Sequence, residues 1–177
     1  MNFRRILCWA ALFTCLLLSV LFFERQPREV HPPATEQSQP RVFTCNEEQV
    51  QEITVIRGAQ QLRLIRNGRD WRTEPDCTDR ISKDHIKSFI TALLETTQID
   101  TVGGAELSRE PFGLMSPWAR IVLRCEANEE PVELELGAMT PSNISLYASL
   151  KGSDRVILIG TYLRFSLNIL FDSAGLK

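Results

Sequence analysis

The sequence predicts an α+β protein: an N-terminal transmembrane helix, then one antiparallel β-sheet-rich domain with a central amphipathic helix and a short C-terminal helix. Three observations lead to this class. They are an uncharged apolar run near the N-terminus, alternating apolar and polar residues in several short segments, and apolar residues at helical spacing in one longer segment. The predicted parts are a cytoplasmic N-terminus (1–5), an anchor (6–23), a Pro-rich linker (24–41) and an extracytoplasmic domain (42–177).

The anchor reads ILCWAALFTCLLLSVLFF and contains no charged residue. A helix of that length is about 27 Å long, which matches the hydrocarbon core of a bilayer. Arg4 and Arg5 precede it and place the N-terminus in the cytoplasm. A cleaved signal peptide begins in the same way, but the run ends without the small residues that cleavage needs, which favours retention. We therefore expect a single-pass protein of the inner (plasma) membrane with a periplasmic or extracellular domain.

The linker reads ERQPREVHPPATEQSQPR, with four prolines and no apolar periodicity. This composition is typical of a semi-rigid spacer. His31 is interpreted as a solvated linker residue. Cys8 and Cys15 of the anchor are interpreted as lipid-facing or helix-packing thiols.

The domain begins with a predicted strand meander. Segments 52–55 and 62–64 alternate apolar and polar residues, and Asn67 with Gly68 forms a turn signal before Trp71. We expect two or three antiparallel strands here.

A helix is predicted next. Ser82 suits the N-cap, and Ile81 and Ile86 stand at the two positions of a hydrophobic staple. Apolar residues from Ile86 to Leu94 follow at the spacing of one buried stripe. His85 is interpreted as a capping or surface residue, because the domain offers it no second histidine.

A second strand-rich half follows Gly103. The tail 161–171 fits both a strand and a helix, and we favour a short C-terminal helix. The candidate strands are 121–123, 132–136, 146–150 and 156–159.

Residues 50–160 contain several short motifs in an order that is similar to that of a known protein family. It starts with Arg66-Asn67-Gly68-Arg69-Asp70-Trp71, continues with Pro111-Phe112-Gly113-Leu114, and includes the strands that follow. In these residues the chain resembles a single unit of the bacterial family catalogued as domain of unknown function 4340. The resemblance implies an envelope-anchored α+β module, some of whose relatives are associated with transporter components, and it implies no catalytic residues.

A tight corner is predicted before the strand at 121–123. Its prolines restrict the backbone and its glycine can take a positive φ, so that the chain turns into the strand. Its large apolar side chains are expected to plug the end of the sheet; the alternative is a partner-binding corner with Trp118 exposed. The corner consists of Pro111, Phe112, Gly113, Leu114, Pro117 and Trp118.

Three cysteines lie in the domain: Cys45, Cys77 and Cys125. An oxidising location and an odd number predict one bridge and one leftover thiol. Cys45 begins the meander and Cys77 follows its last strand, so we predict a bridge between them and a buried free thiol at Cys125. No CxxC spacing or histidine cluster accompanies them, so no metal site is predicted.

Five arginines occur within sixteen residues and can form a basic face on the first part of the sheet. Such a face would contact lipid headgroups or an acidic partner. The alternative is a solvated face balanced by nearby acids. A formal charge of -2 argues against nucleic acid as the partner. The arginines are Arg57, Arg63, Arg66, Arg69 and Arg72.

The sequence contains no Gly-rich phosphate loop, G-x-S-x-G motif or metal-ligand cluster, so no catalytic or cofactor-binding residue is predicted. Glu133 and Glu135 share a strand face, which alternation with apolar residues makes the solvent face. We therefore predict a non-enzymatic envelope protein whose exported domain binds or scaffolds a protein partner, for example as a transporter-associated accessory protein. The alternatives are an inner-membrane adaptor of a secretion or pilus-type machine and, disfavoured, an uncharacterised enzyme.

Overall fold

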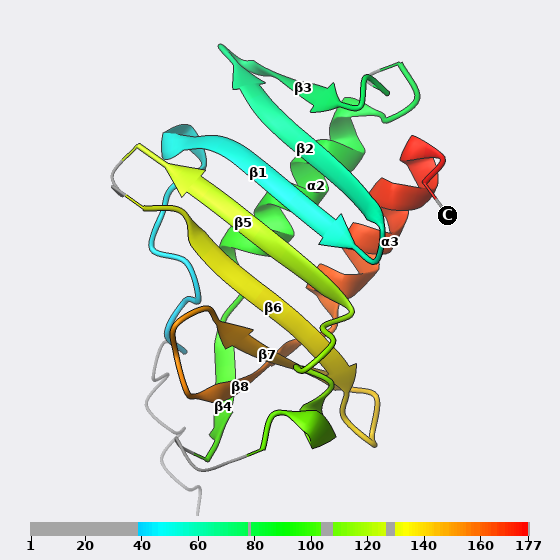
Figure 1. Ribbon diagram of the computed structural model, residues 1–177. Coiled ribbons are helices and arrows are strands. Elements are labelled where there is room, and N and C mark those ends of the chain that lie inside the picture. Colours follow the sequence, from blue (N-terminus) through cyan, green and yellow to red (C-terminus); the bar gives the residue numbers. More distant parts are fainter. Residues whose placement is uncertain (1–38, 78, 104–107, 127–129, 177) are drawn as a thin grey trace, which may run out of the picture. The chain divides into compact units, whose positions relative to one another are not determined.

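In the residues that the structure describes, the domain consists of an eight-stranded antiparallel sheet and two α-helices (Figure 1). The computed structural model describes residues 39–77, 79–103, 108–126 and 130–176. The predicted anchor and residues 24–38 of the linker lie outside the described residues. The elements are β1 (Val50–Arg57), β2 (Gln60–Asn67), β3 (Asp70–Glu74), α2 (Lys83–Leu94), β4 (Gln98–Val102), β5 (Ala119–Cys125), β6 (Val132–Met139), β7 (Ser145–Leu150), β8 (Val156–Gly160) and α3 (Tyr162–Ala174), with short 3-10 turns η1 (Glu47–Gln49) and η2 (Glu110–Phe112).

Strand β1 joins the two halves of the sheet. The strand order is β3-β2-β1-β5-β6-β7-β8-β4, and every neighbouring pair is antiparallel. Strands β1 to β3 form one meander and β5 to β8 a second, and the pairing of β1 with β5 makes them one sheet. Strand β4 lies at the far edge, beside β8. The chain therefore crosses the sheet through α2 between β3 and β4 (Figure 1).

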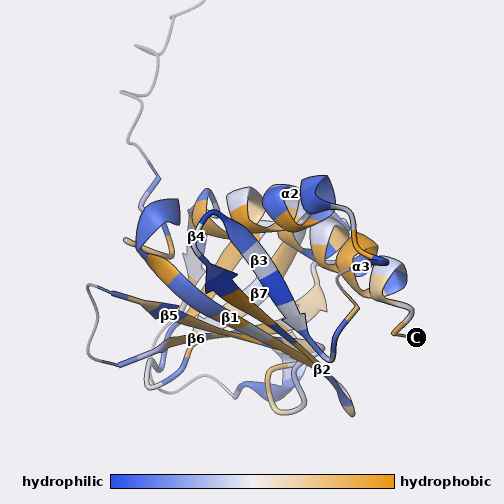
Figure 2. Cartoon of the chain, turned by 90° about the horizontal axis from the view of Figure 1, so that it is seen from above, coloured by the Kyte–Doolittle hydropathy of each residue, from blue (hydrophilic) through white to orange (hydrophobic). Residues whose placement is uncertain are grey.

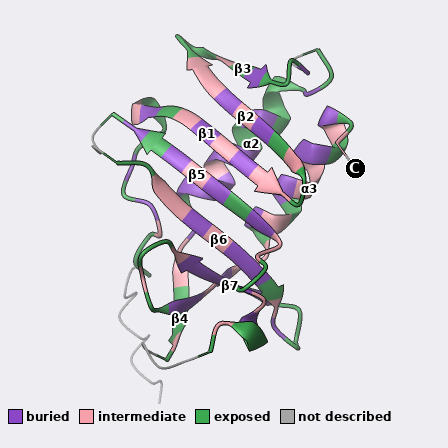
Figure 3. Ribbon diagram, viewed as in Figure 1, coloured by how far each residue is buried: buried purple, intermediate pink, exposed green. Residues whose placement is uncertain are grey.

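Both α-helices cover the same face of the sheet (Figure 2). Strands β1, β2 and β5 alternate buried and more exposed residues (Figure 3), with Ile53 and Val55 of β1 fully buried toward the helices. Phe89 of α2 and Phe171 of α3 are the largest of the fully buried side chains. Burying a side chain of this kind contributes about 1.5–3 kcal/mol. The core thus lies between one sheet face and the two helices, as the alternation predicts.

Helix α2 begins where the sequence predicts. The Ser82 hydroxyl accepts a hydrogen bond from the His85 N–H at 3.2 Å, and Ile81 and Ile86 are both buried. The His85 Nδ1 lies 2.9 Å from the Ser173 Oγ of α3, so this histidine serves the contact between the helices. The C-terminal helix is also confirmed, as α3.

All of the predicted strands are present, and β4 is an addition to them. Its sequence, QIDTV, is exposed or half-buried throughout, so no apolar alternation revealed it. The start of β4 pairs with the segment that enters the domain. The Gln98 N–H donates to the Pro40 carbonyl and the Val42 N–H to the Thr96 carbonyl, each at 2.9 Å.

The disulfide differs from the prediction. Cys45 is bridged to Cys125, with their Cα atoms 6.4 Å apart, and Cys77 is a buried free thiol. The prediction assumed that the start of the first meander, at Cys45, lies beside its end, at Cys77. Instead, Val50 at the start of β1 pairs with Cys125 at the end of β5, which brings Cys45 beside β5. Both the predicted bridge from Cys45 to Cys77 and the predicted free thiol at Cys125 are therefore wrong.

The predicted corner exists, but its apolar side chains lie on both faces of the sheet. Phe112 and Leu114 are buried in a small cluster with Val156, separate from the main core. Trp118 is half-buried and packs against the main core, and the Arg164 guanidinium lies 4.3 Å from the centre of its ring. The structure thus favours the structural interpretation of the corner over an exposed Trp118.

A close backbone contact fixes this corner to β6. Gly113 has φ 67°, a conformation that glycine adopts without strain. A Cβ at Gly137 of β6 would lie 2.2 Å from the Phe112 carbonyl oxygen. Glycine at position 137 therefore allows η2 to pack directly onto the strand.

The disulfide pairing leads to the first prediction. Peptide mapping under non-reducing conditions should recover Cys45 joined to Cys125 and a free Cys77. The bridge spans 80 residues, so the double change Cys45→Ser, Cys125→Ser should lower the free energy of unfolding by about 4 kcal/mol, through the greater entropy of the unfolded chain. Denaturant unfolding measures this loss. Cys77→Ser serves as the control that keeps the bridge, and a bridged Cys77 in the wild type would contradict the prediction.

Candidate partner-binding site

The structure separates the five arginines of the predicted basic face. Arg57 binds the C-terminal helix. Its guanidinium donates to the Asn168 Oδ1 at 3.1 Å and to the Leu176 carbonyl at 3.2 Å, and it lies 4.4 Å from the centre of the Phe171 ring. This arginine therefore holds α3 against the sheet and does not belong to a binding face.

Arg63 lies between two acids on the sheet face opposite the helices, which we call the open face. It forms a forked contact with Glu52, at 2.6 and 2.8 Å, and a further hydrogen bond of 3.2 Å with Glu74. The hydrogen bond from Arg63 holds the pKa of Glu52 below its ordinary value, although burial opposes this effect. The same contact raises the pKa of Arg63. The charge of Arg63 is thus balanced within the sheet.

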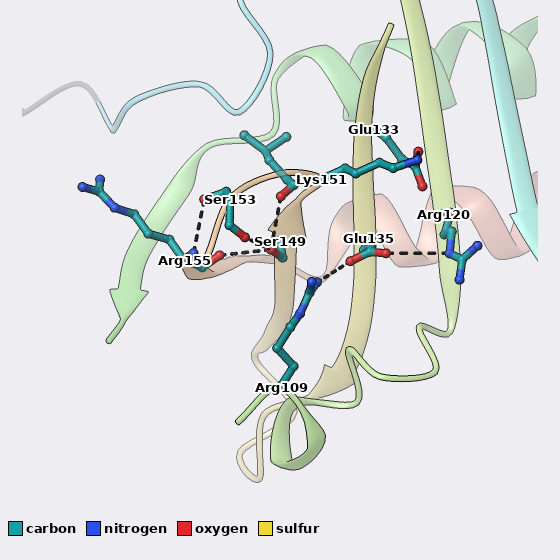
Figure 4. A network of polar contacts seen from close by, with 9 residues as sticks. Arg109, Arg120, Glu133, Glu135, Ser149, Lys151, Ser153 and Arg155 are labelled. Carbon is teal, nitrogen blue, oxygen red and sulfur yellow. Dashed lines mark hydrogen bonds and ion pairs between the residues drawn. The ribbon is translucent and has the colours of Figure 1, made fainter. Parts of the chain in front are cut away.

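The paired carboxylates of β6 are also engaged on the open face (Figure 4). Glu135 contacts the Arg109 guanidinium, and its other oxygen lies 3.8 Å from the Arg120 Nε. The Lys151 Nζ lies 2.8 Å from Glu133. The side chain of Glu135 is 15% exposed and that of Glu133 is 16% exposed. These two acids thus face away from the core, as predicted, and are bound by cations of neighbouring segments.

A groove of about 180 Å³ lies between the tip of the β2–β3 hairpin and the first turns of α2. Its apolar lining comes from Trp71, Ile81 and Ile86. Its charged lining comes from Glu47, Arg69, Asp70, Lys83 and Lys87. We call this site the Trp71 groove.

Positive charge exceeds negative charge around the Trp71 groove. The Lys83 Nζ lies 2.7 Å from the Asp70 carboxylate, so these two charges offset each other. Arg69 and Lys87 have no ion-pair partner within the part of the chain that the structure describes. The groove therefore offers two cations without an ion pair beside a half-buried Trp71 ring, and because Glu47 also lines it unpaired among the described residues, its lining carries one more positive than negative charge.

Arg66 supports the tryptophan. Its guanidinium lies 5.9 Å from the centre of the Trp71 ring, and it donates hydrogen bonds to the carbonyls of Gly68 and Glu47. These bonds connect η1 to the hairpin and hold one side of the groove. Of the five predicted arginines, the structure brings only Arg66 and Arg69 to this site, and Arg72 lies exposed on β3.

The contribution of α2 to the site was not predicted. Lys83 and Lys87 are four residues apart and flank the buried Ile86, so they lie on one side of the helix. That spacing was a signal in the sequence. The spacing indicates a binding site only because α2 packs beneath the β2–β3 hairpin, and the sequence alone does not specify that packing.

Within residues 39–77, 79–103, 108–126 and 130–176, no group of three or more His, Cys, Asp or Glu side chains is placed to hold a metal ion. Neither α-helix in these ranges has the length and apolarity needed to cross a membrane.

No family model, curated protein or solved structure matches the chain. The resemblance to domain of unknown function 4340 therefore stays a prediction.

The Arg63 contacts lead to a prediction about pH. Because the folded-state pKa of Glu52 is lowered, the carboxylate contributes stability above its unfolded pKa of about 4.3, and this contribution is lost as pH falls through the folded value. Arg63→Gln removes the contribution. The variant should therefore be less stable than the wild type near neutral pH, and the difference should shrink below about pH 4.3. Denaturant unfolding at several pH values measures it.

Arg72→Gln is the matched control, because Arg72 is an exposed arginine of the adjacent strand without an ion pair in the described part of the chain. Its effect should be small and independent of pH. A loss of stability in Arg63→Gln that is the same in acid as at neutral pH would contradict the assigned role of Glu52.

Proposed function

We propose that this chain is a non-enzymatic, single-span envelope protein whose extracytoplasmic domain binds a partner protein through the Trp71 groove. The uncharged run at residues 6–23 supports the membrane anchor, and Arg4 and Arg5 support the orientation. The observation on which the binding function rests is the Trp71 groove itself. An aromatic side chain and two cations without an ion pair in the described part of the chain share one concave site there, whose lining carries one more positive than negative charge.

The chemistry of the groove favours an acidic partner segment that carries a large apolar side chain. The apolar side chain would contact Trp71, Ile81 and Ile86, and the carboxylates would meet Arg69 and Lys87. Tryptophan and arginine are the residues that most often dominate binding energy at protein interfaces. Charge complementarity of this kind accelerates association and weakens at high salt.

A scaffold role follows from combining the anchor with one binding groove. The anchor would hold the domain at the membrane, and the groove would bring the partner to it. A transporter component is the partner that the resemblance implies, whereas a component of a secretion or pilus-type machine would indicate the adaptor function. The identity of the bound protein separates these two functions.

The experiment is site-specific photo-crosslinking of the full chain in its native membrane. A photoreactive residue at Lys87 should give a discrete adduct, identifiable by mass spectrometry as a membrane or extracytoplasmic protein. Arg69→Glu should reduce the yield of this adduct about tenfold, because it places a carboxylate opposite the acidic partner. High salt should reduce it as well.

Arg72→Glu is the control variant, because it makes the same charge change on the same hairpin outside the groove. It should leave the adduct unchanged. An equal loss in both variants, or adducts only with cytosolic proteins, would show that the proposed function is wrong.

A further inference from the structure

A second surface of the domain is apolar and lies beside the point where the chain enters it. Tyr162 and Phe165 of α3 are each 60% exposed, and Ile99 of β4 is 45% exposed. The half-buried Ile169 continues the stripe along α3 at positions i, i+3 and i+7. We call Ile99, Tyr162, Phe165 and Ile169 the aromatic edge. Large side chains gathered in this way are typical of a contact surface.

The aromatic edge is continuous with a groove of about 380 Å³. Ile99 and Tyr162 line this groove together with the buried Leu163. Gln39, the first residue that the structure describes, lines it too. The surface is therefore formed jointly by β4, the start of α3 and the entering chain.

The entering chain is fixed at this place by its hydrogen bonds to β4. Residues 40–42 pair with residues 96–98, so the chain leaves the domain at the edge of β4. Only residues 24–38 separate Gln39 from the apolar run, and fifteen residues span at most about 50 Å when fully extended. The aromatic edge thus lies beside Gln39, the described residue that is nearest in sequence to the predicted anchor.

The Trp71 groove lies at the opposite edge of the sheet. The two grooves share no lining residue, and α2 links them: Lys83 lines the Trp71 groove and Glu95 lines the second groove, about 18 Å apart along the helix axis. The aromatic edge and the Trp71 groove can therefore be occupied at the same time.

We propose that the aromatic edge rests in the headgroup region of the lipid bilayer. This inference relies on the membrane anchor of the proposed function. Tyrosine has an apolar ring and a polar hydroxyl, and aromatic side chains of this kind are enriched at the membrane interface. Phe165, Ile99 and Ile169 supply the apolar contact.

Charge contributes little to this contact. The segments that form the surface carry two acids, Glu95 and Asp100, and two bases, Arg41 and Arg164, so the charges there balance. Attraction to anionic lipid is therefore not the driving force. The contact should persist at high salt, unlike binding at the Trp71 groove.

Fluorescence quenching by brominated lipid tests the proposal. The full chain is reconstituted in phosphatidylcholine and phosphatidylglycerol vesicles whose acyl chains are brominated near the headgroup. Phe165→Trp is compared with Arg72→Trp, an exposed position on β3, both in a Trp9→Phe background. The tryptophan at 165 should be quenched at least twice as strongly as that at 72, at low and at high salt. Trp71 and Trp118 are common to both proteins.

The wild-type Trp9 in the apolar run separates the two proposals. Equal quenching of the two introduced tryptophans with strong quenching of Trp9 would overturn the lipid contact and leave the anchor in place. Absence of quenching at Trp9 as well would overturn both. Shielding of the tryptophan at 165 that increases with protein density in vesicles without bromine would identify a second copy as the occupant, and would also overturn the lipid contact.

Discussion

The pairing of β1 with β5 is the constraint on which the rest of the domain depends. It joins two local meanders into one sheet, and it is held on the helix side by Ile53 and Val55 against Ile121 and Leu123. The disulfide between Cys45 and Cys125 closes the same pair at one end. Residues of β1 and β5 are far apart in the sequence, so this contact carries a large entropic cost of loop closure, which the bridge reduces once it has formed. Without this pairing, each meander would expose one long apolar edge strand.

The same pairing determines where the two surfaces lie. With β1 and β5 in the centre, β3 and β4 become the edges, although only α2 and its connections separate them in sequence. Helix α2 therefore spans the covered face, with its first turns beneath the β2–β3 hairpin and its end near β4. Its Lys83 and Lys87 contribute to the Trp71 groove, and its Ala92 and Glu95 line the groove beside the aromatic edge. One helix thus connects the two candidate contact surfaces rigidly.

Local patterns in the sequence predicted what local physics determines. The staple of Ile81 and Ile86 and the cap at Ser82 located α2. Apolar alternation and turn signals located six of the eight strands and left β3 open as the third strand of the first meander. Strand β4 was missed because it is an exposed edge, held by main-chain pairing and without an alternating apolar face. The partner of Cys45 was also missed, because it follows from the β1–β5 register, which no single segment specifies. The Trp71 groove was not predicted: the sequence placed Arg66 and Arg69 on a basic face of the sheet, and the packing of α2 that forms the groove beside them follows only from the three-dimensional fold.

Most of the acidic residues that form ion pairs in the described part of the chain bind bases of the open face or its border, and Arg69 and Lys87 of the Trp71 groove are left without an ion pair. The whole chain has a formal charge of -2, which gives no reason to expect a basic site. On the open face, however, Glu52, Glu74, Glu133 and Glu135 each bind a basic residue of the same face or its border. At the groove, Asp70 is paired with Lys83, and the carboxylate of Glu47 has no ion pair with Arg69 or Lys87. Net charge is a sum over the chain, whereas a partner responds to the charges left unpaired at one place. A mildly acidic domain can therefore present a basic groove, and it does so at the edge of the sheet farthest from the aromatic edge.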